Sequence, residues 1–201
     1  MACHPFFRIA ALAALTFSSL ALYAQAPVEP TAYTVTVRYQ ITGPALRTTY
    51  RLGSKVLVET VPSSGIPPSP TPASPTRTLY FLDTGRSLSW TPSDTTAACR
   101  RGSFQGDAWL DPFSGAADLA MPDVHQVGSD VLHGIAAKIL VSSAKPGFKL
   151  WVDPKTGLML KAEFTPPSSS KALPYFEVTE VHLAPPPAAL FTIPSGCGTQ
   201  R

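Results

Sequence analysis

The stretch FKLWVDPKTGLMLKAEF, residues Phe148–Phe164, contains two runs of mostly apolar residues on either side of a turn sequence. Within the turn, Asp153 can accept backbone hydrogen bonds, Pro154 fixes φ at a value that suits a turn, and Gly157 can adopt a positive φ. The stretch therefore predicts a β-hairpin with one apolar run in each strand.

The two strands of this hairpin are predicted as Phe148–Val152 and Leu158–Phe164. Direct pairing of the residues that flank the turn places Trp151 opposite Leu160. One predicted face carries Trp151, Leu158, Leu160, Ala162 and Phe164, and the other carries Phe148, Leu150, Val152 and Met159, with Lys161 and Glu163 at its end. A hairpin that is apolar on both faces needs cover on both sides, or a cavity on one of them.

Alternating apolar and polar residues predict further strands, most regularly in Tyr33–Thr42. The predicted segments are strands at Thr48–Leu52, Lys55–Val61, Thr78–Asp83, Ser87–Thr91, Ala108–Asp111, Asp130–Ser143 (interrupted by Gly134) and Tyr175–Leu183, and a short helix or loop at Pro112–Met121. The proline-rich stretch at residues 62–76 is predicted to be an exposed loop within the meander of strands. The fold class is therefore mainly β, or α+β at most, with little helix.

The composition favours an extracytoplasmic protein. Charged residues make up 14% of the 201 residues, against about 25% in typical soluble domains. The chain has 22 prolines, which is about twice the usual share. The formal net charge is only +3 and no Lys/Arg cluster accompanies it, so nucleic-acid binding is not predicted.

The first 26 residues have the features of a secretory signal peptide. Arg8 is the only charged side chain, Ile9–Ala24 is apolar, and Ala24-Gln25-Ala26 gives a small-x-small cleavage pattern. Cleavage after Ala24 or after Ala26 fits the pattern, and the alternative is an uncleaved membrane anchor. We expect a single antiparallel β domain at residues 27–201, periplasmic or secreted, with no stable transmembrane span after processing.

Cys99 and Cys197 are the two cysteines that follow the signal peptide. In an exported chain an even number of cysteines predicts a disulfide, the alternative being two unrelated thiols. No nucleophile elbow or phosphate-binding glycine loop is present, and His125, His133 and His182 lack metal-ligand spacing. We therefore expect no catalytic residues, no metal, no cofactor and no enzymatic activity.

The C-terminal part of the chain resembles exported bacterial proteins of the LolA/LolB (lipoprotein-localisation factor) fold. The resemblance lies in a glycine-bearing strand at Leu132–Lys138, the hairpin LWVDPKTGL at Leu150–Leu158, and the closing segment Leu190–Pro194. It implies a curved antiparallel sheet, an incomplete β-barrel, with a hydrophobic cavity on its concave face. The chain departs from the carriers of this family because it has no long amphipathic helices, and its proline-rich stretch lies where they are expected.

Two functions of different classes follow from these observations. The first is a non-catalytic envelope protein that binds an apolar ligand, a lipid or the acyl chain of a lipoprotein, in the concavity of the sheet. The expected ligand contacts are Trp151, Leu158 and Leu160, ahead of Leu150 and Val152. The second is a structural or interaction protein whose concavity is filled by its own side chains and whose protein partners the sequence does not identify.

Overall fold

The computed structural model describes residues 27–40, 45–62, 74–92, 99–105 and 111–197. The signal peptide, most of the proline-rich stretch and three of the four residues of the strand predicted at Ala108–Asp111 therefore lie outside the described residues. Among the described residues, no helix is both long and apolar enough to cross a membrane.

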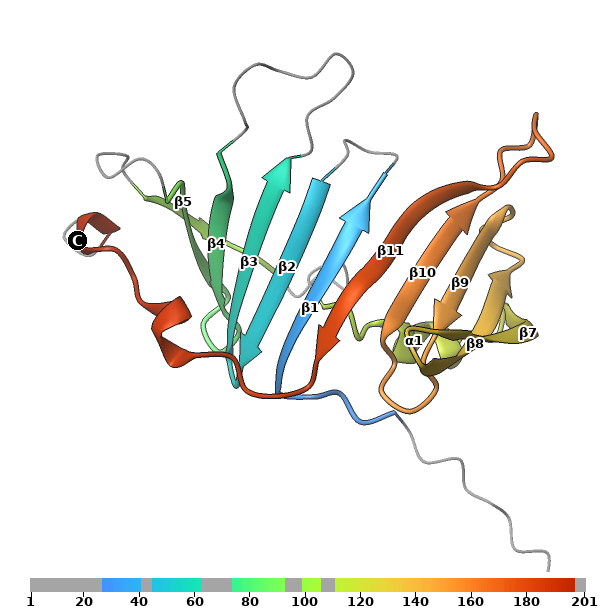
Figure 1. Ribbon diagram of the computed structural model, residues 1–201, viewed down its shortest axis with the longest axis horizontal. Coiled ribbons are helices and arrows are strands. Elements are labelled where there is room, and N and C mark those ends of the chain that lie inside the picture. The colour runs from blue at the N-terminus through green and yellow to red at the C-terminus, as the bar shows by residue number, and fades with distance from the viewer. Residues whose placement is uncertain (1–26, 41–44, 63–73, 93–98, 106–110, 198–201) are drawn as a thin grey trace, which may run out of the picture.

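Eleven strands of the described residues form one antiparallel sheet that does not close into a barrel (Figure 1). The strands are β1 (Ala32–Tyr39), β2 (Ala45–Leu52), β3 (Lys55–Pro62), β4 (Thr76–Phe81), β5 (Arg86–Trp90), β6 (Arg100–Ser103), β7 (Val124–Leu132), β8 (Ile135–Ser142), β9 (Phe148–Val152), β10 (Met159–Phe164) and β11 (Leu173–His182). Three short helices accompany them in the described chain: α1 (Gly115–Leu119), η2 (Ala188–Phe191) and η3 (Ser195–Cys197). The predicted fold class, a curved and mainly β structure with little helix, is confirmed.

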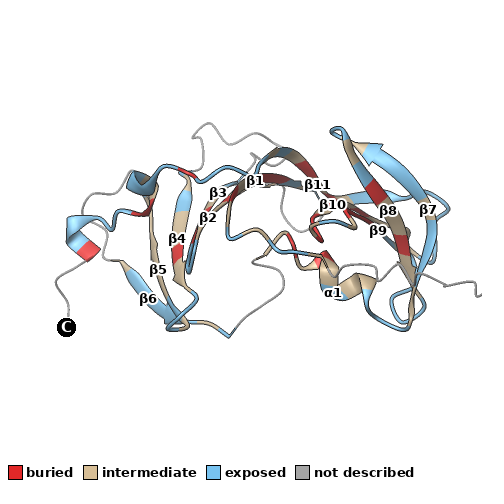
Figure 2. Ribbon diagram, turned by 90° about the horizontal axis from the view of Figure 1, so that it is seen from below, coloured by how far each residue is buried: buried red, intermediate tan, exposed pale blue. Residues whose placement is uncertain are grey.

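The strand order is β6-β5-β4-β3-β2-β1-β11-β10-β9-β8-β7. Each half of the sheet is thus a meander of neighbouring hairpins, β1 to β6 on one side and β7 to β11 on the other. The two meanders meet where β1 pairs with β11. The sheet bends at this junction, so that one of its faces is concave (Figure 2).

The two halves are covered on opposite faces. In Figure 2, α1 lies inside the concave face, whereas the C-terminal segment with η2 and η3 lies outside β4 and β5. The inner core of the C-terminal half joins Tyr33, Val35 and Phe113 to Phe176 and Val178. The outer core of the N-terminal half contains Leu57, Leu79 and Phe191, with Tyr50, Leu52, Phe81, Trp90 and Leu190 packed against it.

The predicted register of the hairpin is wrong beyond its first pairs. The backbone N–H of Asp153 donates to the carbonyl of Leu158 at 2.9 Å, but a β-bulge at Leu160 then shifts the pairing. Trp151 consequently pairs with Lys161 instead of Leu160, and the ammonium of Lys161 lies 4.7 Å from the centre of the indole ring. The bulge adds one residue to β10, so the two apolar stripes expected from strict alternation do not form.

A second correction concerns the predicted strand Asp130–Ser143. His133 and Gly134 both have positive φ, 52° and 77°, and they form a two-residue turn between β7 and β8. Positive φ at both central residues is typical of a type I′ hairpin turn. Gly134 therefore lies in a turn that reverses the chain. The single strand predicted at Asp130–Ser143 is in fact the end of β7, this turn and the whole of β8.

Candidate functional site

The turn between β9 and β10 holds α1 against the sheet. The buried carboxylate of Asp153 accepts hydrogen bonds from the backbone N–H of Lys155 at 2.9 Å and from the hydroxyl of Thr156 at 2.6 Å. Gly157 has a φ of 77°, and a Cβ at this position would collide with Ala116 in α1. The glycine predicted from the turn sequence therefore serves two purposes, the turn conformation and the close approach of α1.

A partly buried polar network fixes the segment that leads into α1. The carboxylate of Asp111 accepts hydrogen bonds from the Tyr33 hydroxyl (3.1 Å), the Arg51 guanidinium (3.2 Å) and the Phe113 backbone N–H (2.8 Å). The rings of Tyr33 and Phe113 lie 4.7 Å apart. Burial, and then the charge of Asp111, raise the pKa of Tyr33, so this phenol stays a neutral hydrogen-bond donor.

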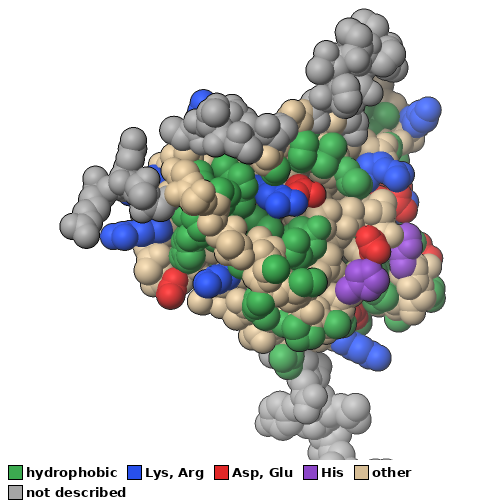
Figure 3. All heavy atoms as spheres, turned by 60° about the vertical axis from the view of Figure 1, so that its left-hand side comes forward, with side chains coloured by type: hydrophobic (Ala, Val, Ile, Leu, Met, Phe, Trp, Pro, Cys, Tyr) green, Lys and Arg blue, Asp and Glu red, His purple; other side chains and the backbone are tan. Residues whose placement is uncertain are grey.

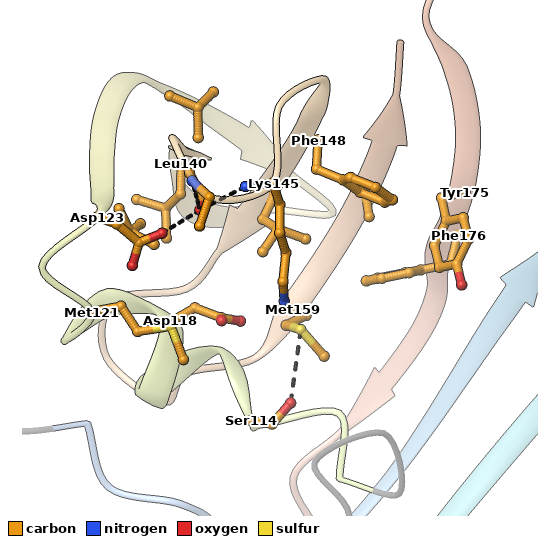
Figure 4. Close-up of a pocket in the computed structure, with 16 residues that line it drawn as sticks. Ser114, Asp118, Met121, Asp123, Leu140, Lys145, Phe148, Met159, Tyr175 and Phe176 are labelled. Atoms are coloured by element: carbon orange, nitrogen blue, oxygen red, sulfur yellow. Dashed lines mark hydrogen bonds between the residues drawn. The ribbon is translucent and has the colours of Figure 1, made fainter. Parts of the chain in front are cut away.

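A pocket of about 670 Å³ opens between α1 and the concave face of β8 to β11 (Figure 4). Six apolar side chains line much of it: Leu140, Phe148, Leu150, Met159, Ala162 and Phe176. Its volume falls within the usual range of small-molecule sites, about 300–1,000 Å³. Because α1 is only five residues long, the helix covers the concave face without filling it.

The charged lining is gathered on one side of this pocket. Figure 4 shows Asp118, Asp123 and Lys145 beside α1 and the turn after β8, whereas Phe148 and Tyr175 lie on the opposite side. The lining therefore has the two ends that an amphiphile requires: an apolar surface for a hydrocarbon chain and a charged rim for a head group.

The two rim carboxylates have different environments. The hydroxyl of Ser142 donates a hydrogen bond of 2.5 Å to Asp123 and lowers the pKa of that carboxyl. Burial raises the pKa of Asp118, an effect that the positive charge of Lys145 opposes. Ser142 also accepts hydrogen bonds from the backbone N–H groups of Ala144 and Lys145, at 3.1 and 3.3 Å. Asp123 thus helps to order the turn that carries the lysine.

Of the five predicted ligand contacts, Leu150 lines the pocket. Trp151, Val152, Leu158 and Leu160 are buried and do not belong to the lining of this pocket. The indole N–H of Trp151 instead donates to the carboxylate of Asp130 at 3.2 Å. Ligand contact by these five residues stays a prediction.

The prediction missed most of the apolar lining, including Leu140, Met159 and Phe176. Strict alternation places Phe148 and Leu150 on the other predicted face, whose end carries the charged Lys161 and Glu163, and therefore favours the uncharged stripe as the ligand contact. One signal was present in the sequence: Phe148 and Leu150 are two residues apart on one strand, so they share a face whatever the pairing of β10.

The outer core of the N-terminal half is filled by side chains from the sheet and from the C-terminal segment. Phe191 of η2 is buried in it together with Leu57 and Leu79, and the disulfide between Cys99 and Cys197 fastens the end of the C-terminal segment. The predicted disulfide is confirmed, with a Cα–Cα distance of 5.1 Å that lies within the normal range. Within the described part of the chain, no group of three His, Cys, Asp or Glu side chains is placed to hold a metal ion.

Comparison with known proteins identifies the fold. No protein-family model matches the chain, and no curated protein does. Among solved structures, MucB is 20% identical with a TM-score of 0.52, and the match covers 87% of this chain but 61% of MucB. An uncharacterized conserved protein from Thermus thermophilus is 17% identical (TM-score 0.48, 81% and 84% covered). A LolA superfamily protein from Nitrosomonas europaea is 13% identical (TM-score 0.33, 85% and 94% covered).

The likeness to MucB is one of fold, and it confirms at that level the resemblance to proteins of the LolA/LolB fold. The matched region spans less than two thirds of MucB. The glycine-bearing strand that suggested the resemblance is in fact a hairpin turn, whereas the hairpin at β9 and β10 is present as expected.

Proposed function

We propose that this chain is a non-catalytic, exported protein of the cell envelope that binds an acyl chain in the pocket beneath α1. The observation that carries the proposal is the pocket of about 670 Å³ on the concave face, lined by apolar side chains of four adjacent strands. The ligand is the hydrocarbon chain of a lipid or of a lipoprotein, and the setting is periplasmic or secreted.

The lining supports a defined orientation of that ligand. The hydrocarbon chain lies against Leu140, Leu150 and Phe176, because burial of apolar surface supplies the binding energy. The head group lies at the rim near Asp118 and Lys145, where charged groups can remain hydrated. An acyl chain therefore enters the pocket and leaves its polar end at the side of α1.

Native mass spectrometry of the protein purified from its host tests whether a lipid accompanies it. The expected result is a mass excess that matches one lipid and disappears on denaturation. A fluorescent fatty-acid analogue then tests the location of the site. We expect Leu150→Asp to abolish its binding, because an unpaired carboxylate beside a hydrocarbon chain in an apolar pocket carries a large desolvation penalty.

Leu88→Asp is the matched control, since Leu88 is also a half-buried strand leucine but lies in the other half of the sheet. It should keep the binding of the analogue, provided that both variants unfold cooperatively. If the wild-type protein binds neither lipid nor analogue, the acyl-chain proposal fails. A structural or interaction protein with a self-filled core is then the better description.

A further inference from the structure

The edge strand β6 offers a second binding surface at the other end of the sheet. All four of its residues, Arg100–Ser103, are exposed. The strand pairs with β5 on one side, and in the described part of the chain the sheet order ends at β6. An edge strand keeps unpaired backbone N–H and C=O groups, which can hydrogen-bond to an added extended segment.

A pocket of about 410 Å³ lies beside this edge, on the outer face of the sheet. Its lining combines apolar residues, among them Phe81, Leu88 and Ile193, with the guanidinium groups of Arg86 and Arg101. Arg101 pairs with Leu88 across the two strands, so their side chains point to the same face, and Arg86 is two residues from Leu88 on that face. The pocket is therefore suited to an apolar side chain with anionic groups next to it.

Three arginines at this end of the sheet form no ion pair with a described carboxylate. No ion pair joins Arg86, Arg100 or Arg101 to a carboxylate among the described residues, whereas Arg77, further along the sheet, pairs with Glu59. Figure 3, which turns this end of the molecule forward, shows basic side chains beside patches of hydrophobic side chains.

The C-terminal segment holds part of this site in place. The guanidinium of Arg101 donates a hydrogen bond of 3.4 Å to the carbonyl of Cys197, and the disulfide to Cys99 fixes that residue. The arginine is thus oriented by a covalently anchored neighbour and keeps further N–H donors for a ligand.

We propose that β6 docks an extended acidic segment of another protein by strand addition. The backbone of the segment hydrogen-bonds to β6, one of its apolar side chains enters the pocket beside Leu88, and its carboxylates pair with Arg86 and Arg101. A second copy of this chain is a poor occupant, because two β6 strands would bring like charges together. The site is independent of the acyl-chain pocket, which lies on the opposite face in the other half of the sheet.

Fluorescence anisotropy with a labelled peptide in which glutamate alternates with valine tests the proposal. The disulfide-bonded wild-type protein should bind it, and binding should weaken as salt is added. Arg101→Glu should raise the Kd at least about tenfold, because it replaces attraction by repulsion. Arg38→Glu, a charge reversal at an exposed residue of β1, should leave the Kd within about twofold.

Two further arms separate strand addition from adsorption to a basic surface. A peptide of the same sequence with methylated backbone nitrogens on one edge should lose binding, since it cannot complete the ladder with β6. Equal binding of both peptides, or equal effects of the two arginine variants, would overturn the proposal. So would binding to anionic lipid vesicles without binding to the acidic peptide at concentrations up to about 1 mM.

Discussion

The N-terminal half of the sheet and the C-terminal half are both antiparallel meanders with an apolar face, yet the pocket beside the covering segment measures about 670 Å³ in the C-terminal half and about 410 Å³ in the N-terminal half. The N-terminal half packs its outer face against the segment that contains Phe191, and the disulfide at Cys197 fastens the end of that segment. The C-terminal half packs its inner face against α1, five residues long, and retains a pocket of about 670 Å³.

The difference follows from how far the covering segment fills the apolar face of the sheet. A segment that inserts large side chains completes the packing, and a covalent link keeps it there. A helix that is anchored through Asp111 and the Asp153 turn, but is too short to span the face, leaves a space. Substitutions in each half of the sheet test this contrast.

Removal of the disulfide should have the largest effect on stability. The Cys99→Ser, Cys197→Ser double variant opens a link of sequence separation 98, for which the chain-entropy model gives up to about 4–5 kcal/mol. Urea unfolding measures the loss. At low urea the variant should still bind the acyl analogue, because the pocket lies in the other half. Loss of that binding in the folded variant would contradict the independence of the two halves.

The next largest effect should come from truncation of the outer core. Phe191→Ala removes a buried ring from a filled core, so we expect the unfolding free energy to fall by about 3–5 kcal/mol. Leu150→Ala, on the wall of an existing pocket, creates less new cavity and should cost less than about 2 kcal/mol. Equal losses in denaturant titrations would mean that the two faces are equally well packed.

Enlarging an alanine should have a smaller effect on stability, and the effect on binding should differ between the pocket and the rest of the core in the same half. Ala162 and Ala137 are both buried in the core of that half, but Ala162 also lines the pocket and Ala137 does not. Ala162→Leu should extend into the pocket, destabilise the protein less than Ala137→Leu does, and weaken binding of the acyl analogue. Ala137→Leu should overpack the core and destabilise by about 1–3 kcal/mol, with binding retained. The reverse pattern in paired unfolding and binding measurements would place the ligand elsewhere.

The smallest effects should come from the two rim carboxylates, with opposite signs. Burial raises the pKa of Asp118, so folding favours its protonated form. The stability that the protonated form contributes is lost as pH rises through the pKa of the folded state. Asp118→Asn should therefore stabilise by a few tenths of a kcal/mol at neutral pH and make little difference below about pH 3.

The hydrogen bond from Ser142 lowers the pKa of Asp123, so this group contributes stability above its unfolded pKa that is lost as pH falls through the folded pKa. Asp123→Asn should consequently destabilise at neutral pH and have little effect in acid. Unfolding of the two variants by urea at both pH values checks the signs. The same sign for both at neutral pH would contradict this description of the rim.

Local patterns in the sequence were sufficient for much of the fold. The strand Phe148–Val152, the Asp153 turn and the strands around Gly53 follow from alternation and turn residues, and the structure has them at or near the predicted bounds. The disulfide followed from the number of cysteines in an exported chain. Each of these features depends on short-range chemistry or on a covalent constraint.

The missed elements depend on tertiary packing instead. β6 (Arg100–Ser103) has no β-branched or aromatic residue, and β7 (Val124–Leu132) is an edge strand whose side chains are mostly exposed. Pairing with a neighbour, not intrinsic preference, makes them strands. The bulge at Leu160 accommodates a fully buried side chain. The pocket exists only where α1 meets the sheet. Neither feature is therefore indicated by the residues next to it in the sequence.

The pairing of β1 with β11 also has a consequence for how the chain reaches this structure. The hydroxyl of Thr179 in β11 donates a hydrogen bond to the backbone carbonyl of Thr36 in β1, and the two residues are 143 positions apart in the sequence. One edge of β1 therefore has no partner strand until β11 has been synthesised. Such long-range closure is slow and leaves the waiting edge open to pairing with other chains. The order of synthesis thus makes the middle of the finished sheet the last part to form.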